Sequence, residues 1–172
     1  EFVERAILTN DFNPLRFKLY GPMSKMIARR LVVENSLYFE ERTVANDIWF
    51  SITSGFYAQK VIADRTMIYC LTVRKGSLEL FVNKERCDER LAAAFRINDF
   101  LKGRGLLRYR FNVCVFLKFY SNFGLVVLLS RFMCICQHYQ GAYLLFMEDL
   151  LECFLKLFKK RKAGFKHVIG KN

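Results

Sequence analysis

Hydrophobic positions change their spacing along this chain, and the spacing predicts its secondary structure. Apolar side chains recur with a helical period over residues 24–35 and again over 44–59, where Thr43 precedes the pattern as an N-cap residue. Residues 61–73 contain two short runs rich in Val, Ile, Thr and Tyr, a composition typical of β-strands. We therefore predict an α/β fold in which a small sheet edge at 61–73 is flanked by the two helices.

The C-terminal half is predicted to be mostly helical. A long charged helix should run from 81 to 102, and residues 140–162 show the spacing of an amphipathic helix. Between them, residues 111–136 are almost wholly apolar, with Lys118 and Arg131 as interruptions. Neither uninterrupted stretch reaches the roughly 18–20 residues of a transmembrane helix, so spanning the bilayer and lying on it both stay open.

Composition divides the chain near residue 105. We predict a first part, residues 1–105, and a helical, basic and amphipathic second part, residues 106–172. The net charge of +12 is concentrated toward the end: residues 1–100 carry 15 Lys and Arg against 13 Asp and Glu, whereas 101–172 carry 13 against 3. The amphipathic helix gathers its apolar side chains on one stripe: Met147, Leu150, Leu151, Phe154, Leu157 and Phe158.

The basic second part favours an anionic partner, and the residues around its charges indicate which one. Proteins that bind nucleic acid place Lys and Arg among polar and aromatic groups on an exposed surface. Helices that bind membrane surfaces pair Lys and Arg with a broad apolar face, as Phe, Leu, Val and Met do here. We therefore expect an anionic membrane surface as a partner, and no nucleic acid.

The six cysteines form no C-x-x-C pair. A zinc site could be built from Cys134, Cys136 and His138, but their i, i+2, i+4 spacing is not a usual zinc pattern. Free thiols in apolar surroundings, in a reducing compartment, are the favoured interpretation.

A series of short motifs in the first part is more specific than its composition. In chain order the motifs are Pro22-Met-Ser-Lys25-Met, Leu31-Val-Val-Glu-Asn35-Ser-Leu-Tyr-Phe39, Asn46-Asp47-Ile-Trp-Phe50, Met67-Ile-Tyr69 and Arg74-Lys-Gly76-Ser77-Leu78. Their order and spacing resemble the second half of the catalytic domain of family 2 glycosyltransferases, which use nucleotide-sugars to build cell-surface polysaccharides. The resemblance covers roughly residues 18–105.

The resemblance implies the second half of a glycosyltransferase A-type nucleotide-sugar fold. It also implies transfer of a sugar from a nucleotide-sugar to a glycan or lipid-linked acceptor, at the cytoplasmic face of the membrane. The complete enzyme would use a divalent metal, Mg or Mn. The chain departs from the family at Asn46, where Glu is usual, and at Met23, near a usual Trp. It also has no Asp-x-Asp motif, so we expect an acceptor-side fragment that binds no metal and is inactive alone.

Asp47 is the expected catalytic residue. An inverting sugar transfer needs a carboxylate to take the proton of the acceptor hydroxyl as that hydroxyl attacks the anomeric carbon. A carboxylate in the first turn of a helix is held ionised by the helix dipole, by a few tenths to about 1 kcal/mol, and therefore acts as a base. The alternative is that Asp47 simply favours the N-terminus of its helix.

Five further residues are candidates for binding the acceptor or the diphosphate. Arg74, Gly76 and Ser77 combine a cation with a tight turn, which suits an anionic group, or they form an ordinary charged hairpin turn. Trp49 would stack on a sugar face, or belong to the core. Lys25 would face an acceptor phosphate, or be a solvated helix charge. The neighbouring loop residues Glu40 and Glu41 are interpreted as solvated.

A second class of function stays open. A non-catalytic helical protein that binds membrane surfaces, or acts as a scaffold, accounts for the basic amphipathic region and leaves the residues around Asp47 without a role. In both interpretations we expect a peripheral protein on the cytoplasmic face of the membrane.

Overall fold

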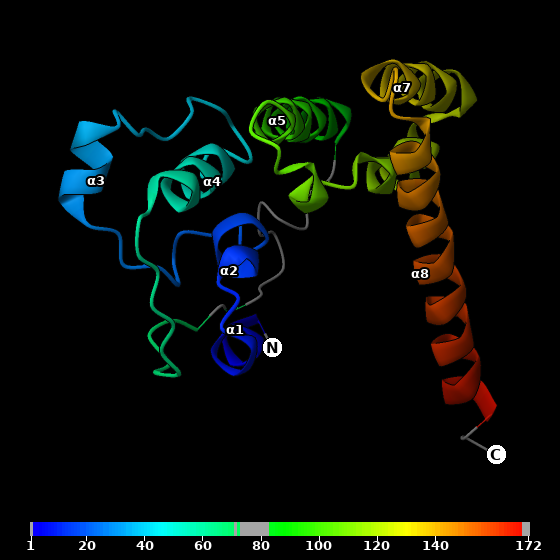
Figure 1. The fold of residues 1–172 in the computed structure, drawn as a ribbon. Coiled ribbons are helices and arrows are strands. Elements are labelled where there is room, and N and C mark those ends of the chain that lie inside the picture. Colours follow the sequence, from blue (N-terminus) through cyan, green and yellow to red (C-terminus); the bar gives the residue numbers. More distant parts are fainter. Residues whose placement is uncertain (1, 71, 73–82, 170–172) are drawn as a thin grey trace. The chain divides into compact units, whose positions relative to one another are not determined.

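The computed structural model describes residues 2–70, 72 and 83–169, and their side chains up to residue 156. The chain forms two compact units, Glu1–Phe111 (unit 1) and Asn112–Asn172 (unit 2). Figure 1 shows that helices joined by loops make up both units.

The helices of unit 1 are α1 (Phe2–Thr9), α2 (Asn13–Phe17), α3 (Arg29–Glu34), α4 (Ile48–Tyr57), α5 (Lys84–Lys102) and a 3-10 turn at Leu107–Tyr109. The helical period correctly predicted α4 and α5 to within a few residues at each end. The helix expected at 24–35 is shorter, because α3 begins only at Arg29. The residues before it form a turn and an extended segment.

The predicted α/β fold is wrong, because the described residues contain no β-strand. Residues 60–70 run without regular structure, and much of the rest of the expected sheet edge lies outside the described residues. A strand is stable only when its backbone groups pair with a neighbouring strand. No such neighbour exists in the described part of unit 1, and Ile62, Met67 and Ile68 stay exposed. Strand propensity alone was therefore not enough to form a sheet edge at 61–73.

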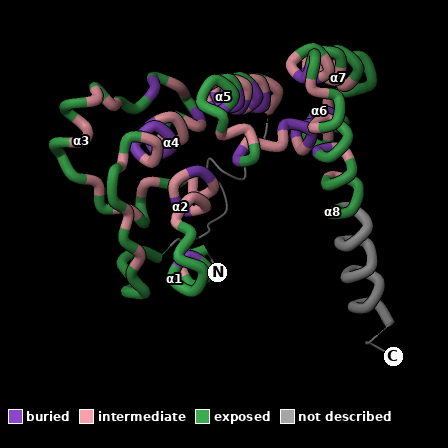
Figure 2. The backbone as a smooth tube through the Cα atoms, in the orientation of Figure 1, coloured by how far each residue is buried: buried purple, intermediate pink, exposed green. Residues whose placement is uncertain are grey.

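Helix α4 is the centre of unit 1. It contacts α2, α3 and α5, and its residues from Phe50 to Ser54 are all buried (Figure 2). The core of the unit is a cluster of buried side chains from α2, α4, α5 and the 3-10 turn: Phe17, Ile52, Ile97, Leu101 and Tyr109. Because side chains surround it on several sides, α4 is the best-anchored element of the unit.

Helix α2 approaches α4 very closely. A Cβ atom on Gly55 would lie 2.5 Å from the carbonyl oxygen of Arg16, so this contact needs a glycine. The Arg16 guanidinium also donates hydrogen bonds to the carbonyl oxygens of Gly55, at 3.0 Å, and Ala58, at 2.6 Å. These bonds satisfy backbone acceptors that the end of a helix leaves without partners. The C-terminal end of α4 is thereby held against α2.

Unit 2 contains 3-10 turns at Val113–Phe116 and Ser121–Phe123, together with α6 (Leu117–Tyr120), α7 (Leu125–His138) and α8 (Tyr143–Ile169). The prediction of a mostly helical C-terminal region is confirmed. The apolar stretch expected at 111–136 is broken into short turns followed by α7. Among the described residues, no helix is both long and apolar enough to cross a bilayer.

Hydrogen bonds fix the rotation of α8 within unit 2. The Tyr139 hydroxyl, at the end of α7, donates to the buried carboxylate of Asp149 on α8. The Asn112 side-chain amide donates to the carbonyl oxygen of Asp149 at 3.0 Å and to the carboxylate of Glu152 at 2.7 Å. The side of α8 that bears Asp149 therefore faces the interior of the unit.

Candidate functional site

Asp47 lies at the N-terminal end of α4, at the N-cap position. Its carbonyl oxygen accepts a 2.9 Å hydrogen bond from the Ser51 amide, but its side chain makes no capping hydrogen bond to the helix. An Asp at this position ordinarily accepts from a backbone amide of the first turn. The half-buried carboxylate therefore stands at the positive end of the helix dipole without serving as the cap.

Lys25 lies near Asp47, on the segment that precedes α3. Its ammonium group donates to the carbonyl oxygen of Leu19, at 2.6 Å, and to the hydroxyl of Ser51. Burial lowers the pKa of Lys25 to about 8, and the negative charge of Asp47 opposes this shift by raising the pKa. The structure thus brings together two of the predicted site residues, and Lys25 is not simply a solvated charge.

Ser51 and Ala45 also belong to this arrangement, although neither was predicted as a site residue. Ser51 is one helical turn beyond Asp47, on the same face of α4, and this i, i+4 spacing was a usable signal. Ala45 has φ +58°, a left-handed backbone conformation that a non-glycine residue rarely adopts. Such conformations cost about 1–3 kcal/mol and cluster at functional sites. No sequence pattern marks an alanine in this conformation.

Trp49 lies apart from Lys25, against α5. Its ring makes an edge contact with Phe100, with 5.2 Å between ring centroids, and the Arg96 guanidinium lies 3.9 Å above the Trp49 ring. Trp49 also packs against the core cluster of unit 1. This placement fits the core alternative better than a sugar-stacking role.

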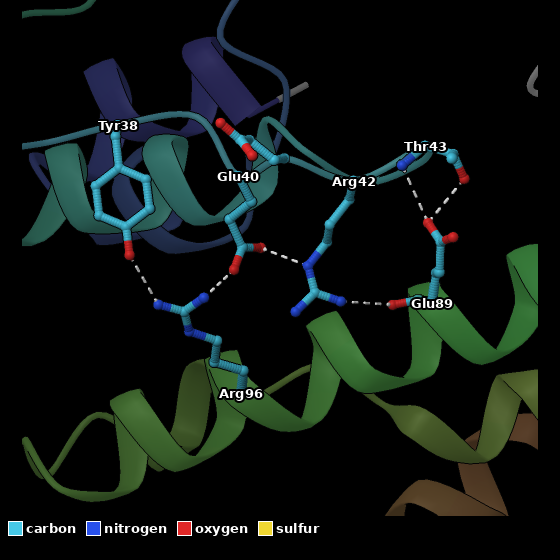
Figure 3. A pocket seen from close by; sticks show the side chains of 7 residues that line it. Tyr38, Glu40, Arg42, Thr43, Glu89 and Arg96 are labelled. Carbon is cyan, nitrogen blue, oxygen red and sulfur yellow. Dashed lines mark hydrogen bonds and ion pairs between the residues drawn. The ribbon is translucent and has the colours of Figure 1, made fainter.

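An open hollow of about 800 Å³ lies between the 38–43 loop and α5 (Figure 3). Its lining is mostly charged and mutually bonded. The Glu40 carboxylate pairs with Arg96 and, at 3.2 Å, with Arg42. Glu40 was expected to be solvated, but it is buried, with only 8% of its surface exposed. The two guanidinium groups attract its carboxylate into the interior, a contact between distant segments that local sequence does not show.

Two further carboxylates line the hollow: Glu41, which is exposed as expected, and Glu89 of α5. Glu89 accepts hydrogen bonds from the backbone amide of Thr43 at 3.1 Å, the Thr43 hydroxyl at 2.8 Å and the Val44 amide at 3.3 Å. These bonds, foremost that from the Thr43 hydroxyl, lower the pKa of Glu89. The paired charges of Glu40, Arg42, Glu89 and Arg96 therefore join the loop to α5.

No cluster of three or more His, Cys, Asp or Glu side chains in the described part of the chain could hold a metal ion. Cys134, Cys136 and His138 likewise form no such cluster, and the cysteines are free thiols.

A second candidate site is the outer face of α8 in unit 2. Six large apolar side chains of this helix are 53–83% exposed: Tyr143, Leu144, Met147, Leu151, Phe154 and Leu155. At about 100° per residue they share a face roughly 120° wide. The expected stripe is thus partly realised as an exposed surface. Leu150 is half-buried, while the side chains of Leu157 and Phe158 lie outside those described.

Of the predicted site residues, Lys25 and Asp47 therefore lie together, Trp49 lies against α5, and the Arg74, Gly76 and Ser77 turn lies outside the described residues. Comparison with protein-family models, with curated proteins and with solved structures finds no significant match for this chain.

Proposed function

We propose that unit 1 activates an acceptor hydroxyl for sugar transfer, with Asp47 as the general base. The observation that carries this proposal is the placement of the Asp47 carboxylate. It stands at the N-terminus of α4, makes no capping bond to its own helix, and lies within electrostatic reach of Lys25. The motif resemblance supports this proposal. The α/β fold that the resemblance implied gives no support, because the described residues contain no strand.

In the proposed step, Asp47 accepts the proton of the acceptor hydroxyl. The hydroxyl oxygen attacks the anomeric carbon of a nucleotide-sugar, and a new C–O bond forms. The bond from that carbon to the diphosphate breaks, and its electron pair goes to the phosphate oxygen. Lys25 supplies a positive charge beside the base, which suits an acceptor that carries phosphate, such as a lipid-linked one.

The surroundings of Asp47 favour this role over mere helix capping. A general base must be held in place, and α4 is fixed by its buried residues and by the close contact at Gly55. The strained backbone at Ala45, two residues before the base, is a further feature of functional sites.

The test is the substitution Asp47→Asn. We expect membranes from cells that produce the protein in its natural context to transfer labelled sugar from a nucleotide-sugar to lipid-linked acceptors. Loss of a general base should lower this rate about 10²–10⁴-fold and leave donor binding unchanged. Asp64→Asn, at an exposed carboxylate, is the matched control. Transfer by Asp47→Asn within a few fold of wild type contradicts the proposal, as does the absence of transfer by wild type.

A second proposed function is docking of unit 2 on an anionic membrane surface, and the outer face of α8 favours it. Unit 2 does not itself cover this apolar face. The same helix continues into a segment with Lys159, Lys160, Arg161 and Lys162. Apolar burial contributes about 25 cal/mol per Å², and each Lys or Arg near an anionic surface contributes about 1 kcal/mol.

Docking is tested by co-sedimentation with vesicles of neutral or mixed neutral and anionic lipid. We expect wild type to prefer anionic vesicles and to lose affinity with salt. Replacing residues 159–162 by Gln should weaken binding to anionic vesicles at least tenfold. Equal sedimentation of wild type and variant, with no effect of salt, contradicts electrostatic docking. If docking holds but Asp47→Asn has no effect on transfer, the non-catalytic alternative is favoured.

A further inference from the structure

We propose that α7 provides a second membrane-contacting face of unit 2, and that this face lies in the surface of an anionic bilayer. The face consists of Leu125, Val126, Leu129 and Met133. The inference rests on the proposed docking of α8 and adds a second helix to it, so that unit 2 would bind lipid through two apolar faces.

The four side chains are large, apolar and uncovered by unit 2. Their exposed fractions are 69% for Leu125, 82% for Val126, 53% for Leu129 and 58% for Met133. At about 100° per residue they share a face roughly 100° wide. A monomer in water gains nothing from four such residues on one exposed face, so the face indicates an interaction surface.

Much of the rest of the α7 surface is used for packing. Ile135 is fully buried, and the ring of Phe132 lies 6.1 Å from that of Phe146 on α8. These contacts fix the rotation of α7 within unit 2. Because the rotation of α7 is fixed, its exposed apolar face points in one fixed direction, as the outer face of α8 does.

The charges of unit 2 indicate which partner fits. Helix α7 contains no Asp or Glu, and its Arg131 lies on the packed side, 5.9 Å from the centre of the Tyr120 ring. The acidic residues of unit 2 are Glu148, Asp149 and Glu152, all on α8; exposed Glu148 borders the apolar face, and the other two lie further from it. Asp149 is buried against Tyr139, and Glu152 pairs with Lys156. Two exposed apolar faces, in a unit with nine Lys and Arg against three Asp and Glu, complement anionic lipid.

The length of α7 places it along the membrane surface. Its 14 residues span about 21 Å, whereas the hydrocarbon core of a bilayer is about 30 Å thick. A helix with one apolar face and one packed face satisfies its backbone internally and inserts its side chains to a shallow depth. We therefore expect the α7 face to lie in the interfacial region.

The test uses the whole chain and vesicles with 30% anionic lipid. The double variant Val126→Gln, Leu129→Gln removes apolar surface without changing charge, and Gln preserves helix propensity. We expect it to bind at least tenfold more weakly than wild type and to keep the same salt dependence. Ser130→Gln, an exposed position of α7 outside the apolar face, is the matched control and should bind as wild type does. Circular dichroism of each variant should match wild type.

A spectroscopic measurement gives a second readout. The only tryptophan of the chain is Trp49 in unit 1, so Leu129→Trp adds a reporter on the α7 face. We expect an additional blue-shifted emission on vesicle addition, quenched by brominated lipid, and no such component in wild type.

The outcomes separate the two proposals. If wild type binds anionic vesicles, but the double variant binds equally well and the new tryptophan is not quenched, the α7 inference is wrong and docking by α8 stands. If wild type does not bind at all, both fail. If the double variant changes the oligomeric state in solution but not vesicle binding, the face joins two copies of this chain, and the membrane assignment is overturned.

Discussion

Helices α4 and α8 carry apolar residues with a similar period but have opposite surroundings. Helix α4 is enclosed by other elements of unit 1, and even its hydroxyl residues are buried, with Thr53 and Ser54 donating to backbone carbonyls of the same helix. Helix α8 faces its own unit through the side that carries Asp149, while most of the large apolar side chains described on it, up to residue 156, point outward. An enclosed helix can position a catalytic group, whereas a helix with a free apolar face can bind a surface.

Truncating one side chain in each helix tests most directly whether α4 and α8 differ in burial. Ile52→Ala removes a fully buried side chain of α4 and should lower the free energy of unfolding of unit 1 by about 2–5 kcal/mol. Leu144→Ala removes an exposed side chain of α8 and should change stability by less than about 0.5 kcal/mol. Denaturant unfolding followed by Trp49 fluorescence and by circular dichroism measures both. Equal effects would mean that the two helices do not differ in burial.

A smaller effect is expected from filling the contact between α2 and α4. Gly55→Ala places a methyl group 2.5 Å from the Arg16 carbonyl oxygen, so the two helices must separate. Overpacking of this kind costs about 1–3 kcal/mol. Gly103→Ala is the control, because its nearest neighbouring atom would be 3.6 Å away and its φ of −63° suits alanine. Similar unfolding midpoints for the two variants would show that the close contact is not present in solution.

In unit 2 the corresponding experiment removes one hydroxyl. Tyr139→Phe leaves the buried Asp149 carboxylate without this hydrogen bond, at a cost of about 1–3 kcal/mol. We expect this loss to speed hydrogen exchange of the α8 amides near Asp149, as measured by mass spectrometry. Tyr143→Phe, at an exposed tyrosine of the same helix, should leave exchange unchanged. Unchanged exchange in Tyr139→Phe would mean that other contacts fix the rotation of α8.

Lys25 should confer a pH dependence on the stability of unit 1. Burial holds its pKa at about 8 in the folded chain, against 10.5 for an unperturbed lysine. Between these values the unfolded chain binds a proton that the folded chain does not, so stability should rise with pH from about 8 to 10.5 and be independent of this group below that range.

Two variants test the pH dependence. Lys25→Met should remove the rise. Asp47→Asn should lower the pKa of Lys25 further, because Asp47 raises it. The rate of amine acylation at Lys25 as a function of pH, followed by peptide mass spectrometry, measures the pKa directly. A midpoint near 10.5 in wild type would place the amine in solvent.

Much of the helical content was predictable, but the first part of the chain was assigned to the wrong class. Helical periods located α4 and α5, since their apolar residues repeat along one face. The segment at 61–73, with Val, Ile and Thr, has strand propensity, yet a strand needs a partner that the described residues do not provide. The proximity of Asp47 and Lys25 and the burial of Glu40 between Arg42 and Arg96 both depend on contacts between distant segments.

The amino-acid sequence was enough to show which residues share a helical face, because side-chain direction follows from the fixed rotation per residue. It also determined the concentration of Lys and Arg near the C-terminus, since charge depends on composition alone. Which helical faces are buried depends on the tertiary contacts. The hydrogen bonds of Tyr139 and Asn112 turn one side of α8 inward and leave Met147 and Leu151 exposed. Burial depends on contacts between residues far apart in the chain, and no local pattern encodes these contacts.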